Sequence, residues 1–115
     1  MEINRKNLSC DVLIAGGGIG GTYGVMPELF LKMEQLVKAG EMEKARKIQY
    51  AANSVIYKMC SAHGNMYGVI KAILKINEGL ELGGVRKPLA ALIDSDKPIV
   101  EEAAKMIRDA KAKYL

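Results

Sequence analysis

Apolar residues recur with a helical period along most of the chain after Pro27. Over positions 29–37 their spacing is i, i+1, i+4, i+7 and i+8, which places them on one face of an amphipathic helix. Pro27 suits the first turn of this helix, where a missing N–H costs little, and Ala39-Gly40 should end it. The apolar face consists of Leu29, Phe30, Met33, Leu36 and Val37.

The same spacing predicts two further helices. One begins near Glu41 and ends at the cap signal His63-Gly64; the next is capped by Asn65 and stopped by Gly79. Only a residue or two near Gly40 separates the first two helices, so they should form an antiparallel hairpin. The predicted buried faces are Met42, Ala45, Ile48, Ala52, Val55, Ile56 and Met59 in one helix, and Met66, Val69, Ile70, Ile73, Leu74 and Asn77 in the other.

A connector, "LELGGVRKPLAALIDSDKP", separates the third helix from the last. At about twenty residues it is long for a compact domain, so we expect it to pack across another element. The final helix is predicted from about Pro98 to Lys113. Its acidic start and basic end suit the helix dipole, and its apolar face is Ile99, Ala103, Met106, Ile107 and Ala110.

The segment "DVLIAGGGIGG", residues 11–21, carries the pattern G-x-G-x-x-G at Gly16, Gly18 and Gly21. A dinucleotide site also needs a helix opening at the last glycine and a second strand ending in an acidic residue. Here Pro27 would interrupt that helix, and Glu41 lies between helices. The sequence therefore favours a short, crowded glycine-rich strand, which another backbone or a small ligand can approach closely. Dinucleotide binding remains the alternative.

The predicted fold class is mainly α, with one glycine-rich strand and about four helices. A lone strand can neither satisfy its backbone groups nor bury both of its faces. Neighbouring strands must therefore come from outside this chain.

Composition excludes several classes of function. The 115 residues are 50% hydrophobic and carry a net charge of +4, but the basic residues alternate with acidic ones, which argues against nucleic-acid binding. Apolar runs are too short to span a membrane and a signal-peptide layout is lacking, so we expect a cytoplasmic protein. Cys10, Cys60 and His63 are too few for a metal site or a Cys–His nucleophile, and we expect free thiols.

Three segments together carry a family resemblance: "GGIGGTYGVMPELFLKMEQLVKAGEMEKARKIQ", "NMYGVIKAILK" and "GGVRKPLAAL". They resemble the C-terminal part of the N-acetylneuraminate lyases, within the superfamily that includes dihydrodipicolinate synthase. The resemblance implies a single partial domain. Residues 17–39 would be the last strand and helix of an eight-stranded β/α barrel, and 41–115 the additional C-terminal helices. Residues 1–16 match poorly.

The resemblance also implies a chemistry. These enzymes are class I aldolases that cleave N-acetylneuraminate to N-acetylmannosamine and pyruvate, using a lysine that forms a Schiff base with pyruvate. That lysine, a tyrosine and a carboxylate-binding loop lie in earlier strands, so no catalytic residue, metal or cofactor maps here. Gly21, where the family often has serine, and Thr22 are the candidate substrate-binding residues. We expect the chain to be inactive alone, to meet sialic acid or pyruvate only when complemented, and to form homo-oligomers.

Other candidates have simpler interpretations. Lys71 and Lys75 could be nominated as Schiff-base lysines, but solvated or snorkelling side chains are the favoured interpretation. The side chains predicted to be packing residues are Tyr23, Tyr50, Tyr57 and Tyr67. A non-catalytic helical module that self-associates through apolar patches remains a second alternative.

Overall fold

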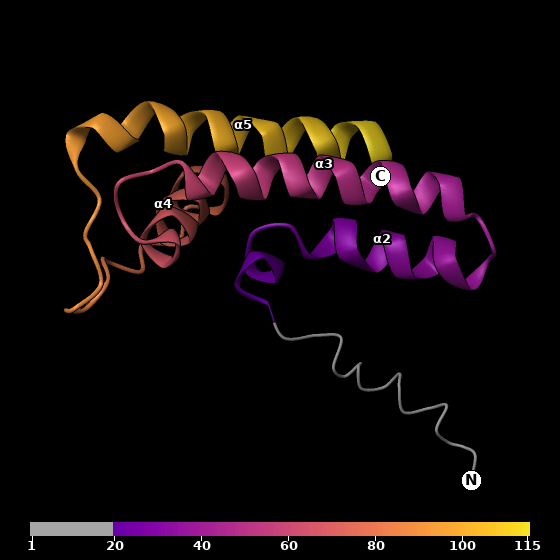
Figure 1. Ribbon diagram of the computed structural model, residues 1–115, viewed down its shortest axis with the longest axis horizontal. Helices are drawn as coiled ribbons and strands as arrows, with labels where there is room; N and C mark the ends of the chain where they lie inside the picture. The colour runs from indigo at the N-terminus through magenta and orange to yellow at the C-terminus, as the bar shows by residue number, and fades with distance from the viewer. Residues whose placement is uncertain (1–19) are drawn as a thin grey trace, which may run out of the picture.

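The computed structural model describes residues 20–115 and consists of helices and their connections (Figure 1). All four predicted helices are confirmed, and with them a mainly α fold. The helices of this range are α2 (Pro27–Lys38), α3 (Met42–Cys60), α4 (Met66–Glu78) and α5 (Lys97–Tyr114), together with the short 3₁₀ helices η1 (Gly21–Gly24) and η2 (Asp94–Asp96).

The helices form a layer of three with a fourth across one end. Figure 1 shows α2, α3 and α5 lying side by side, with α4 seen almost end-on beside them. Gly40 makes the turn between α2 and α3 with a φ of +79°, a left-handed conformation that glycine adopts without steric cost. The predicted antiparallel hairpin is therefore confirmed.

The hydrophobic core lies where α5 packs against the other three α-helices. Most predicted apolar positions are confirmed as buried or half-buried, but Val37 and Met42 remain 48% and 52% exposed. Both lie at the tip of the α2–α3 hairpin, which extends past the end of α5 (Figure 1), so no third helix covers them. The largest fully buried apolar side chains are Met26, Leu29, Ile48, Val55, Met59, Val69, Ile73 and Ile107.

The predicted glycine-rich strand is not found within residues 20–115. Gly20 is extended, but Gly21–Gly24 form η1, in which backbone N–H groups bond to carbonyls three residues back. A strand needs a neighbouring strand to satisfy its backbone, whereas a 3₁₀ turn satisfies its own. The rest of the predicted strand, with Gly16 and Gly18, lies outside the described residues.

The end of α3 also differs from the prediction. The helix ends at Cys60 with Ser61 as its C-cap, so His63-Gly64 is not the cap. These two residues instead lie in the α3–α4 turn, where other segments bind their backbone. The caps of α4 are confirmed: the Asn65 side chain accepts a hydrogen bond from the Tyr67 N–H at 2.9 Å, and Gly79 ends the helix with a φ of +73°.

The long connector packs across α4, as expected of its length. Lys71 Nζ donates to the Gly84 carbonyl at 2.7 Å, and the Asn65 N–H donates to the Ala90 carbonyl at 2.8 Å. Leu92 lies against Gly64, which has no side chain that would prevent this close contact. The connector is therefore tied to α4 at several points along its length.

Candidate functional site

The two predicted substrate-binding residues lie together in η1. Thr22 is only 8% exposed, and its carbonyl accepts hydrogen bonds from the N–H groups of Val25 and Met26, each at 3.2 Å. Its hydroxyl has no hydrogen-bond partner within residues 20–115.

Gly21 is exposed to solvent and borders the first two turns of α4. A Cβ atom placed on Gly21 would lie 3.1 Å from Ile70 Cδ1 and 3.2 Å from Tyr67 Cε1. The backbone of Gly21 can therefore approach α4 more closely than most residues could. The position of α4 therefore limits the space beside Gly21.

Lys71 and Lys75, the two lysines considered for a Schiff-base role, both contact the connector. Lys71 Nζ donates to the Gly84 carbonyl, and Lys75 Nζ lies 2.6 Å from Glu81 Oε2. Both amines are engaged with groups of the connector, and the Lys75 side chain is 59% exposed. This placement favours the structural interpretation of both residues over a Schiff-base role.

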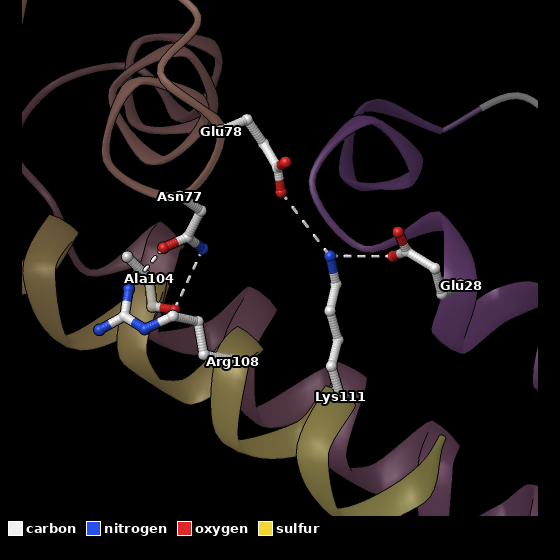
Figure 2. A network of polar contacts seen from close by, with 6 residues as sticks. All are labelled: Glu28, Asn77, Glu78, Ala104, Arg108 and Lys111. Carbon is white, nitrogen blue, oxygen red and sulfur yellow. Dashed lines mark hydrogen bonds and ion pairs between the residues drawn. The ribbon is translucent and has the colours of Figure 1, made fainter.

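A polar cluster joins α2, α4 and α5 near the point where η1 leads into α2 (Figure 2). Lys111 Nζ lies 2.9 Å from Glu28 Oε1 and 3.9 Å from Glu78 Oε1. Beside it, Asn77 donates to the Ala104 carbonyl at 3.2 Å and accepts a hydrogen bond from Arg108. The Lys111 hydrogen bond lowers the pKa of Glu28, against the opposing effect of partial burial. This cluster links side chains or backbone of three helices.

A second polar cluster, which we call the Asp96 clamp, joins the turn at His63-Gly64 to the turn at Ile93–Asp96, at the other end of α4. Asp96 is 2% exposed, and its carboxylate accepts three backbone hydrogen bonds: from His63 at 2.7 Å, and from Gly64 and Ile93 at 3.0 Å each. These bonds outweigh burial and lower the pKa of Asp96, with the Ile93 bond as the largest cause.

The contacts of the Asp96 clamp were not predicted from the sequence. The available signal was an aspartate directly before the Lys97-Pro98 helix start, which is an ordinary N-cap pattern. That pattern cannot reveal a carboxylate that reaches a turn more than thirty positions earlier in the chain.

Lowering the pH from about 6 to about 3 should destabilise the chain more than its Asp96→Asn variant. The folded-state pKa of Asp96 lies below the ordinary value, so this stabilisation is complete above about pH 3.9 and is lost as the pH falls through the folded-state pKa. Urea unfolding at each pH measures the effect. Asp94→Asn is the matched control, because the Asp94 side chain is 99% exposed; equal pH profiles for both variants would contradict the prediction.

Three comparisons with known proteins give the class of protein. In the described fold, Gly21 and Thr22 lie in the short turn η1, and Gly21 borders α4. The chain belongs to the dihydrodipicolinate synthetase family, whose sequence model matches residues 8–107. This confirms the superfamily expected from the sequence.

Individual relatives within this family are N-acetylneuraminate lyases. The chain is 68% identical over 112 residues to the N-acetylneuraminate lyase of Mediterraneibacter gnavus, a match covering 97% of this chain and 36% of the relative. It is 38% identical to the N-acetylneuraminate lyase of Rhizobium meliloti, over 77% of this chain and 29% of the relative. The chain thus spans about a third of the length of these curated relatives.

A solved structure agrees with the sequence matches. The fold superposes on wild-type Ruminococcus gnavus sialic acid aldolase with a TM-score of 0.83 and 72% identity, covering 84% of this chain and 32% of that one. A second structure, of the catalytic lysine mutant of that aldolase, matches equally well.

Metal-binding groups and membrane-spanning helices are both absent from residues 20–115. In the part of the chain that the structure describes, His, Cys, Asp and Glu side chains nowhere gather in a group of three that could hold a metal ion. Within the same residues, each helix is too short or too polar to cross a membrane.

Proposed function

We propose that this chain supplies the C-terminal helical part of a Schiff-base aldolase that cleaves N-acetylneuraminate to N-acetylmannosamine and pyruvate. The main support is the 68% identity to an N-acetylneuraminate lyase of which the chain spans 36%. In this proposal residues 17–39 end the barrel and residues 41–115 form its additional helices, with residues 1–16 as a segment of its own. The exposed, free thiol of Cys60 fits a reducing cytoplasm.

The proposed role of η1 is to border the substrate. Thr22 has a buried hydroxyl without a partner in residues 20–115, and Gly21 offers exposed backbone beside it. Active sites of β/α barrels lie at the carboxyl ends of the strands, and this proposal puts η1 at that face of the barrel. Gly21 and Thr22 would therefore contact sialic acid through backbone groups and one hydroxyl.

The decisive experiment is a chimera. The matching 36% of the Mediterraneibacter gnavus lyase is replaced by this chain, and cleavage of N-acetylneuraminate is assayed. We expect activity within about tenfold of the parent lyase, because small positional changes already reduce rates. The control is the same chimera with its catalytic lysine mutated, which should be inactive. A soluble, folded but inactive chimera would refute the proposal.

The 115 residues alone should neither cleave N-acetylneuraminate nor be trapped on pyruvate by borohydride. The family's Schiff base requires a lysine from an earlier barrel strand, and Lys71 and Lys75 are engaged with the connector and Glu81. Mass spectrometry after borohydride reduction checks this, with the chimera as the positive control. A single pyruvyl adduct on the isolated chain would contradict it.

Self-association is a second candidate function, favoured by exposed apolar side chains. Tyr50, Tyr57 and Tyr67, expected to be packing residues, are instead 62%, 73% and 54% exposed. Leu31 is also 61% exposed, and exposed apolar groups of this size promote association when they form patches. Light scattering of the isolated chain should detect dimers or larger species, whereas a monomer at high concentration would contradict this candidate.

A further inference from the structure

We propose that Asp96 is a positioning residue for the Gly21–Thr22 segment, acting through the first two turns of α4. The inference rests on the proposed function in that it takes this segment to border the substrate. Asp96 itself does not contact the segment; it holds the turn from which α4 starts. Three successive contacts connect Asp96 to the Gly21–Thr22 segment.

The first step is the clamp itself. The Asp96 carboxylate accepts hydrogen bonds from the His63 and Gly64 N–H groups, and these residues lie directly before α4. Gly64 is also in close contact with Leu92, since a Cβ atom on Gly64 would lie 2.9 Å from the Leu92 backbone. The start of α4 is thus held by a buried carboxylate and by close backbone packing.

The second step is the start of α4. Asn65 follows Gly64 directly; its N–H donates to the Ala90 carbonyl, and its side chain caps the helix at Tyr67. The chain from Gly64 into α4 therefore has hydrogen bonds at successive residues. Ile70 lies four residues after Met66, the first residue of α4, which is about 6 Å along the helix at a rise of 1.5 Å per residue.

The third step is the contact with η1. Tyr67 and Ile70 lie on the side of α4 that faces Gly21, close enough to leave no ordinary space for a Cβ atom there. Ile70 is buried, whereas Tyr67 is 54% exposed. A shift of the start of α4 would move both side chains relative to Gly21 and so displace the backbone that leads into Thr22.

The chain provides a matched control two residues away. Asp94 is also an acidic residue of η2, but its side chain is 99% exposed and its recorded ion pair is with Lys97 at 3.4 Å. Asp94→Asn changes the net charge by the same amount as Asp96→Asn. A difference between the two variants therefore reports the clamp rather than the charge.

The first test uses the isolated chain and needs no activity. In ¹H–¹⁵N NMR spectra, Asp96→Asn should shift the amide signals of Gly21 and Thr22 as well as those of residues 63–70. Asp94→Asn should leave the Gly21 and Thr22 signals unchanged. Shifts confined to residues 62–65 and 90–97 would refute the coupling.

The second test uses the lyase chimera. Borohydride trapping with pyruvate counts the competent sites, and KM and kcat per site are then measured. A positioning role predicts that Asp96→Asn raises the KM for N-acetylneuraminate at least about fivefold relative to Asp94→Asn. A purely structural role would reduce the number of sites and leave KM unchanged, which would refute the inference. An inactive unsubstituted chimera would instead count against the proposed function.

Discussion

Replacing Ile107 with alanine should lower the free energy of unfolding by about 2–5 kcal/mol, a cost typical of truncating a buried isoleucine. Ile107 is 0% exposed and lies on α5, the helix that packs against α2, α3 and α4. The cavity would therefore form at the centre of the core, where close packing limits relaxation. Urea unfolding followed by circular dichroism measures the change.

Two further variants make this result specific. Ile76→Ala removes the same atoms from a side chain that is 47% exposed, so it should cost much less. Ile107→Val should cost about 0.5–1.5 kcal/mol and remain folded even where the alanine variant does not. Equal costs at positions 76 and 107 would show that α5 is not at the centre of the core.

Gly64→Ala should destabilise the chain by about 1–3 kcal/mol, in the range for overpacking a closely packed site. The new Cβ atom would lie 2.7 Å from Leu92 Cδ2 and 2.9 Å from the Leu92 Cα and N atoms. A side chain can rotate away, but the backbone of Leu92 cannot move without disturbing the connector. The φ of Gly64 is not positive, so the cost comes from contact rather than from backbone conformation.

Gly84→Ala is the control for this substitution. Gly84 lies in the same connector as Leu92, has a negative φ and has no atom within 4 Å of an added Cβ. Alanine there should be neutral or slightly stabilising, because it restricts the unfolded chain. If both variants had the same free energy of unfolding, the close contact between Gly64 and Leu92 would be excluded. Differential scanning calorimetry distinguishes the two outcomes.

Local patterns in the sequence were enough to predict the helices. α2 and α4 begin and end within a residue of prediction, because Pro27, Asn65, Gly40 and Gly79 act on the backbone near them. The end of α3 was wrong by three residues. His63-Gly64 is a valid cap signal, but the His63 N–H binds the Asp96 carboxylate and Gly64 packs against Leu92. Contacts with residues this far away in the chain cannot be predicted from the neighbouring sequence.

The candidate site was predicted only in part. Gly21 and Thr22 were identified through a family resemblance, and the structure places Gly21 against α4. Two features of the site could not be predicted. The Thr22 hydroxyl lacks a partner within residues 20–115, and the Asp96 clamp holds the start of α4. Both depend on which segments meet after folding.

The sequence by itself determined the helices, their apolar faces and the family, because each is encoded by residues close together in the chain or by direct identity. The tertiary structure decided which apolar positions remained exposed, where α3 ended, and that Gly21–Gly24 formed a 3₁₀ turn instead of a strand. The physical reason is the same in each case. Burial and backbone hydrogen bonding depend on partners supplied by distant segments, and a periodic pattern specifies a face without specifying what covers it.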